Sequence, residues 1–88
     1  MIHVEKPTEE KLNKLNARSW PIWEKEISVF PWEYDETETC YIIEGEVIVT
    51  HDNGDPVKFG KGDLVVFSQG LKCKWTIINP VRKHYKFG

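Results

Sequence analysis

Apolar and polar residues alternate with a period of about two from Ile22 to the C-terminus, which limits the chain to a fold rich in β-strands. Neighbouring side chains on a strand point to opposite faces, so this pattern is typical of strands with one buried face. It predicts strands over residues 27–34, 40–51, 57–59, 64–67, 71–78 and 81–87.

Short turn sequences separate these segments. Asp52-Asn53-Gly54-Asp55 predicts a type I′ hairpin, because Asn and Gly adopt positive φ at little cost. Gly60-Lys61-Gly62-Asp63 and Ser68-Gln69-Gly70 predict two further turns. Neighbouring strands are therefore expected to be antiparallel, since no crossover helix is predicted after residue 20. The expected fold class is all-β: a sandwich, a meander or a jelly-roll barrel.

The N-terminal part predicts one short helix near residues 8–17. Thr8 is suited to cap its start, acidic residues follow in the first turn, and Leu12 and Leu15 fall on one face. At 88 residues the chain has room for one hydrophobic core, so we expect a single domain over residues 1–88.

Composition argues against several classes of protein. No apolar run approaches the roughly 20 residues of a membrane helix, and the N-terminus lacks the pattern of a signal peptide, so we expect a cytoplasmic protein without membrane contact. Cys40 and Cys73 are far apart in sequence, which favours free, reduced thiols. The cations after Asp63 are scattered over two strands, so no nucleic-acid partner is expected.

Two ionisable residues fall on strand faces that are otherwise apolar. Alternation places Glu38 on the inward face of one strand and Lys83 on that of the last strand. Because an isolated buried charge is costly, we predict that the two form an ion pair at the mouth of the barrel. The other residues expected to face inward are Phe30, Trp32, Tyr34, Cys40, Ile42, Cys73, Trp75, Ile77, Val81, Tyr85 and Phe87.

Residues 32–47 resemble the first motif of the cupin family, with Glu38 and Gly45 at the positions of its Glu and its Gly. Residues 62–73 resemble the second motif, in which Gly62 and Gly70 are retained. Segments 74–75 and 80–85 are similar to those of small cupins grouped with the cupin domain of (S)-ureidoglycine aminohydrolase. The resemblance implies a cupin barrel, which is a jelly roll or double-stranded β-helix, and the residues before it predict the one short helix.

The resemblance also bears on metal binding, because cupins commonly hold a metal through three His and one Glu of these motifs. Here Trp32, Tyr34 and Cys73 stand at the His positions, and only Glu38 remains. Metal sites usually need three or four matched ligands, so we expect no tightly bound metal and no cofactor. If a metal were bound, its ligands would be Glu38, Cys73 and Tyr34, and the metal Mn, Zn, Fe or Ni. The histidines lie at no motif position and are expected at the surface: His3, His51 and His84.

These observations leave three functional hypotheses. The leading one is a metal-free module that binds a small polar organic ligand in the barrel mouth, through Trp32, Tyr34, Glu38, Cys40, Cys73, Trp75 and Lys83. The second, suggested by the resemblance, is an enzyme acting on a small nitrogenous substrate, with Glu38 in proton transfer. The third is a homodimer in which Trp20, Ile22 and Trp23 pack across a two-fold interface, and it is compatible with either of the others.

Two roles are considered for Cys73. A thiolate near Lys83 would be a nucleophile, whereas a Cys buried among aromatic residues is more often an inert, small apolar residue. The second reading is preferred.

Overall fold

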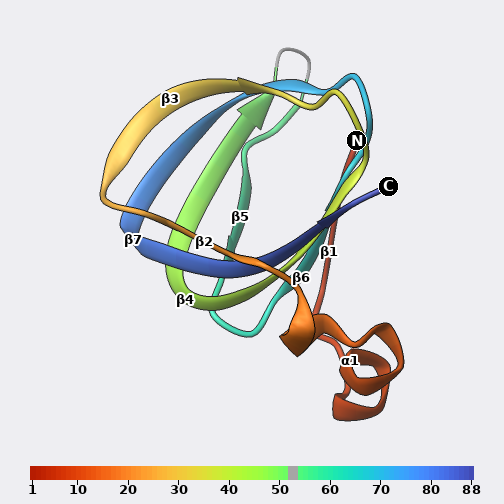
Figure 1. Cartoon of the computed structure of the whole chain (residues 1–88). Helices are drawn as coiled ribbons and strands as arrows, with labels where there is room; N and C mark the ends of the chain where they lie inside the picture. Colours follow the sequence, from red (N-terminus) through yellow and green to blue (C-terminus); the bar gives the residue numbers. More distant parts are fainter. Residues whose placement is uncertain (52–53) are drawn as a thin grey trace.

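The computed structural model describes residues 1–51 and 54–88, and within them it contains seven strands and one short α-helix (Figure 1). Every strand pair is antiparallel. The elements, in chain order, are β1 (Ile2–Glu5), α1 (Glu9–Leu15), the 3-10 helix η1 (Ala17–Ser19), β2 (Ile22–Lys25), β3 (Ser28–Glu33), β4 (Glu38–His51), β5 (Val57–Gly60), β6 (Leu64–Phe67) and β7 (Lys72–Phe87). The expected all-β fold with one N-terminal helix is therefore confirmed.

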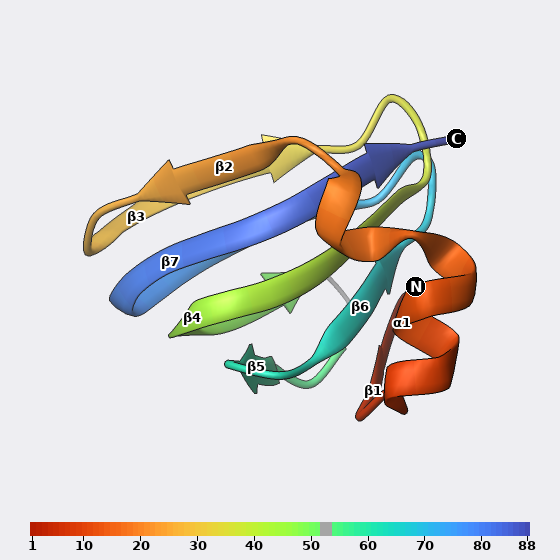
Figure 2. The same cartoon turned by 60° about the horizontal axis from the view of Figure 1, so that its bottom comes forward.

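Two long strands, β4 and β7, organise the barrel. They pair with each other from Glu38↔Phe87 at one end to His51↔Cys73 at the other. β6 and β5 pair with the first and second halves of β4, and β2 and β3 pair with the second and first halves of β7. Both long strands curve strongly, so the sheet curls on itself (Figures 1 and 2).

The two strands predicted over residues 71–78 and 81–87 are one continuous strand, and that prediction is wrong. β7 runs through Asn79-Pro80, where the β4–β7 register shifts. Gly45 lies opposite with a φ of +111°, and a Cβ built on it would lie 2.6 Å from the carbonyl oxygen of Pro80. The strand therefore bends at the proline instead of ending, because the facing glycine leaves room for its backbone.

Two strands, β1 and β2, were not predicted individually. β1 pairs with β6, and β2 pairs with the end of β7, from Ile22↔His84 to Lys25↔Val81. Each has only four residues, which is too short for a periodic pattern to stand out. Figure 2 shows β1 beside β6 at one edge of the sheet and β2 near β7 at the other.

Helix α1 lies within the predicted range and outside the barrel (Figure 1). The Thr8 side chain accepts a hydrogen bond from the Lys11 backbone N–H at 3.1 Å, as expected for an N-cap. Leu12 is buried with Ala17 and Leu64, but Leu15 is 38 % exposed. The helix ends at Leu15, and Asn16 forms its C-cap with a φ of 57°, so of the two leucines on one face only Leu12 is buried.

The core confirms most of the predicted inward faces. Cys40, Ile42, Trp75, Ile77 and Val81 are buried in one apolar cluster. Trp32 and Phe87 are the main exceptions: they are 48 % and 46 % exposed, near the ends of β3 and β7. Cys40 and Cys73 are both buried and carry free thiols, as expected.

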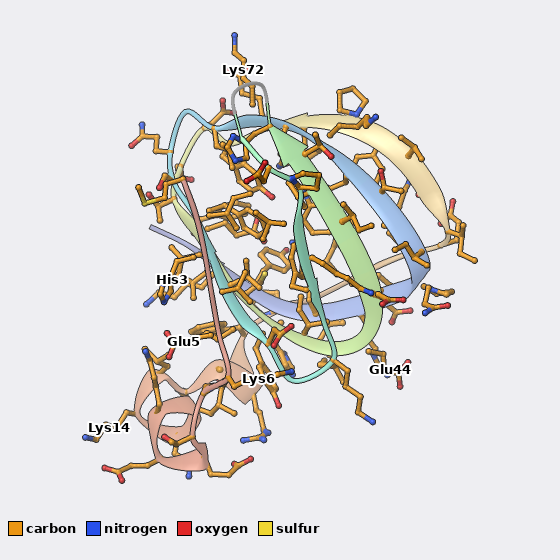
Figure 3. All side chains as sticks on the ribbon, turned by 180° about the vertical axis from the view of Figure 1, so that it is seen from behind. His3, Glu5, Lys6, Lys14, Glu44 and Lys72 are labelled. Atoms are coloured by element: carbon orange, nitrogen blue, oxygen red, sulfur yellow. The ribbon has the colours of Figure 1, made fainter. Side chains whose placement is uncertain are left out.

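The turns at residues 60–63 and 68–70 are present, with positive φ at Gly62 and Gly70. The hairpin predicted at Asp52-Asn53 lies outside the described residues. Charged side chains such as Lys14, Glu44 and Lys72 project away from the barrel (Figure 3). No helix in the described ranges is long and apolar enough to cross a membrane.

Candidate functional site

A cavity of about 170 Å³ lies where β3 and β7 end and β4 begins. Its walls are aromatic, and its two charged lining residues are Glu38 and Lys83. Trp32 and Phe87, each about half exposed, form part of its rim. The complete lining is Trp23, Phe30, Trp32, Tyr34, Glu38, Trp75, Lys83, Tyr85 and Phe87.

The predicted ion pair lies in this cavity. Lys83 Nζ donates to Glu38 Oε2 at 2.5 Å, and the two side chains are only 6 % and 4 % exposed. Strand alternation explains this position, because each residue faces inward from one of the two long paired strands. The two charges compensate each other in a place that excludes most water.

Two indole rings enclose the lysine ammonium. Lys83 Nζ lies 4.9 Å from the ring centroid of Trp23 and 4.9 Å from that of Trp75. Both distances are within the range of cation–π attraction. The indoles meet edge to face, with centroids 5.9 Å apart and an interplanar angle of 76°. The ammonium is therefore held by one carboxylate and two aromatic faces.

The other walls are held by aromatic packing. Phe30 stacks on Trp75 with centroids 6.0 Å apart, and Tyr34 stacks on Phe67 at 4.7 Å. Trp75 Nε1 donates a hydrogen bond to the Tyr34 hydroxyl at 3.1 Å. Burial and the nearby charge of Glu38 raise the pKa of Tyr34, so the phenol stays neutral. The cavity walls are preformed and carry no further charge from Tyr34.

The structure does not bring the two cysteines into this cavity. Cys40 is completely buried between Val65 and Tyr85 in register, and burial raises the pKa of its thiol to about 12. Cys73 lies toward the start of β7, beside a separate surface depression, and burial raises its thiol pKa as well. Both thiols are therefore protonated at neutral pH, which agrees with the inert reading of Cys73.

The residues at the cupin metal positions do not fit a metal ion. Glu38, the only carboxylate there, is neutralised by Lys83, and the Tyr34 hydroxyl and Cys73 thiol both have raised pKa values. Metal binding needs deprotonated donors, and an ammonium next to the carboxylate repels a cation. Among the described residues no cluster of three or more His, Cys, Asp or Glu side chains is placed to hold a metal.

Sequence reasoning missed four lining residues, of which Trp23 is the most important because it contacts Lys83. It was assigned to a dimer interface because β2 was not predicted. Trp20, in the same segment, packs against the cluster that contains Leu12. Of the three residues expected at the dimer interface, Ile22 is therefore left as the most exposed. The other three were expected to face inward, and strand parity could have placed them in the site: Phe30, Tyr85 and Phe87.

The histidines play no part in the cavity. His3 lies 3.6 Å from the Glu5 carboxylate at the surface, as expected. His84 is half-buried instead, with Nδ1 2.9 Å from the Trp20 carbonyl oxygen, because the segment that leads into β2 contacts β7 at this point.

A short antiparallel barrel with the motif residues Glu38 and Gly45 in these positions defines a cupin. More narrowly, the chain belongs to the EutQ-like cupin domain family, whose model matches residues 12–85. The activity of this family is not established by the match, so function has to be argued from the site.

Solved structures agree with this assignment. A DUF861 family protein from Thermotoga maritima is 53 % identical, with a TM-score of 0.98 and complete coverage of both chains. A DUF861 protein from Pseudomonas syringae pv. tomato is 31 % identical, with a TM-score of 0.69, over 76 % of this chain and 29 % of that one.

The Clostridium difficile EutQ protein shares the fold at 23 % identity, with a TM-score of 0.68. The match covers 75 % of this chain and 52 % of EutQ, so the chain corresponds to about half of that protein. No curated protein matches the chain. The narrower resemblance to (S)-ureidoglycine aminohydrolase stays a prediction.

Proposed function

We propose that the protein is a binding module for a small organic molecule that occupies the aromatic cavity without a bound metal. The observation that supports this proposal most strongly is that the cavity combines aromatic walls with one buried ion pair at its base. Small-molecule sites typically combine apolar walls with a few fixed polar groups that orient the ligand.

The ion pair supports a binding role over a purely structural one. A buried pair contributes little more to stability than apolar residues of the same size, because desolvation offsets the attraction. A lysine ammonium has three N–H donors, and within the described residues its only hydrogen-bond acceptor is Glu38. The remaining donor capacity is available to a molecule in the cavity.

A fragment titration tests this proposal. Trp23, Trp32 and Trp75 line the cavity, so a bound ring should change tryptophan fluorescence and the indole N–H signals in NMR spectra. Trp32→Ala removes part of the rim and should weaken binding by about fivefold, a typical value for one aromatic contact. Val29→Ala, on the same strand but outside the cavity lining, is the matched control and should leave affinity unchanged. Equal affinities of the two variants would contradict the proposal.

An enzyme acting on a small nitrogenous compound is the second candidate. It is supported by the position of Glu38, whose Oε2 is held by Lys83 while the carboxylate also lines the cavity. Such a carboxylate could accept a proton from a bound substrate. Ammonia release from ureido and α-amino compounds, and turnover of ethanolamine, for which a Salmonella relative is named, should be measured with Glu38→Gln as the control. Release that persists in Glu38→Gln would remove this residue from catalysis.

We further propose that the chain forms a homodimer through the segment that precedes and includes β2. Ile22 is exposed there on an edge strand. Light scattering should give twice the 10.3 kDa chain mass, and Ile22→Lys should return the protein to monomers. A monomer in the unmodified protein would contradict this.

A further inference from the structure

We infer that the base of the cavity is an ammonium-binding site that the chain fills with its own Lys83, and that this occupancy restricts the ligand to neutral, single-ring molecules with a hydrogen-bond acceptor. The restriction on the ligand rests on the proposed binding function, whereas the nature of the site does not.

The groups around Lys83 Nζ are those that recognise free amines. They are one carboxylate, from Glu38, and the faces of two indoles, from Trp23 and Trp75, at 4.9 Å each. Aromatic cages of this kind bind organic ammonium ions through the negative potential of the ring faces. Here the cation is covalently part of β7, so an external ammonium ion cannot enter.

Three elements build this cage independently of the lysine. Trp23 comes from β2, Glu38 from the start of β4 and Trp75 from the first half of β7. The rings are also fixed by other contacts, since Phe30 packs on both indoles and Tyr34 accepts a hydrogen bond from Trp75. Removal of the lysine ammonium is therefore expected to leave the cage standing.

The charges in the cavity are already balanced. Its lining contains one cation, one anion and seven aromatic side chains, and Tyr34 stays neutral because burial raises its pKa. A carboxylate ligand would add a second negative charge beside Glu38, and an amine a second positive charge beside Lys83. Either would leave a net charge in a poorly hydrated space, which is unfavourable. A neutral ligand avoids this cost.

The volume of the cavity encloses about one ring of a ligand. An engineered apolar cavity of about 150 Å³ holds benzene, and this cavity measures about 170 Å³. A carbonyl or ring-nitrogen atom on that ring can accept a hydrogen bond from an N–H of Lys83 that is not bonded to Glu38. Benzamide combines these properties, whereas benzoate and benzylammonium have the same shape with opposite charges.

The first test compares these three probes on the unmodified protein at constant ionic strength. Benzamide should bind at least about tenfold more tightly than either ion, equivalent to about 1.4 kcal/mol. Tightest binding of benzoate would overturn the inference and make Lys83 an anion receptor. Tightest binding of benzylammonium would overturn it as well, because the ammonium site would then be open.

The second test removes the resident ammonium by Lys83→Met. Benzylammonium should now become the best of the three probes, and propylammonium chloride should raise the melting temperature more than sodium chloride does. The control is the double variant Glu38→Gln/Lys83→Met, which has no charge in the cage and should show neither effect. A Lys83→Met protein that gains no preference for amines would overturn the inference.

These measurements separate the inference from the proposed function. If no probe binds the unmodified protein, the proposed function fails, yet stabilisation of Lys83→Met by propylammonium still decides whether an ammonium site exists. If Lys83→Met folds only with propylammonium, the inference is supported. If it folds in neither salt, the cage does not persist without the lysine ammonium and does not accept an external one, which would overturn the inference.

Discussion

The chain places two acidic residues with lysine partners in very different surroundings. Glu38 and Lys83 are both buried, in an aromatic cavity. Asp63 also pairs with a lysine, Lys6, at 2.8 Å, but that lysine is 75 % exposed. The carboxylates are alike in being largely buried, so the difference lies in the burial of the cation.

The backbone contacts of the two acids differ as well. Asp63 Oδ2 accepts a hydrogen bond from the Gly60 N–H at 2.8 Å and closes the turn between β5 and β6. Glu38 contacts a side chain, Lys83, and lines a cavity. Asp63 therefore has a structural role, and a buried acid in a cupin motif is not by itself a sign of a binding site.

The largest effect is expected from Lys83→Met. Loss of the ammonium leaves the Glu38 carboxylate buried without its partner, which typically costs about 3 to 5 kcal/mol. The free energy of unfolding in urea measures this. The matched substitution Lys6→Met removes the ammonium from the exposed pair. A similar loss of unfolding free energy in that variant would show that the buried and the exposed pair contribute equally to stability.

The double variant Glu38→Gln/Lys83→Met should recover part of the loss. With both charges removed, no unpaired ion remains in the cavity, so the two single effects should not add. The double-mutant cycle should give a coupling energy well above about 0.3 kcal/mol. A smaller value would mean that the two charges are stabilised separately.

Asp63→Ala should have an intermediate effect. It leaves the Gly60 N–H without its acceptor in a partly buried turn, at a cost of about 1 to 3 kcal/mol. Asp63→Asn keeps a side-chain oxygen and should restore much of the stability, which urea unfolding would show. No recovery in Asp63→Asn would assign the loss to the charge instead of the hydrogen bond.

The smallest effect is expected from Lys6→Met. An exposed pair contributes about 0 to 1 kcal/mol, and salt screens it. Thermal unfolding at low and high salt should show a small difference from the unmodified protein that disappears as salt is added. A large, salt-insensitive loss would show that Lys6 is coupled to the turn in another way.

The comparison also shows where sequence reasoning succeeded. The alternation of side chains along a strand predicts that Glu38 and Lys83 face inward. Because an unpaired buried charge is unfavourable, it also predicts that they pair, although they are 45 positions apart in the sequence. The sequence did not predict that Asp63 is buried, because an acidic residue is common in a turn motif such as the one that contains it.

The errors share one physical origin. The alternation of side chains predicts the face of a strand on which a side chain lies, but not how far along the barrel axis it lies. Cys40 and Cys73 face inward as predicted, yet neither lines the cavity: Cys40 is completely buried opposite Tyr85 in the register, and Cys73 lies near the start of β7. Trp23 was misassigned because four residues are too few to mark β2 as a strand.

The sequence by itself determined the fold class, the helix cap at Thr8, the inward faces and the loss of the metal ligands. These features depend on local periods, turns and residue chemistry, which neighbouring positions encode. Only the tertiary structure decided that Trp23 and Trp75 enclose Lys83 and that the cysteines lie outside the cavity. Those contacts depend on the register and curvature of β4 and β7. The close approach of Gly45 to Pro80 bends the two strands and shifts their register, and no local sequence pattern indicates this approach.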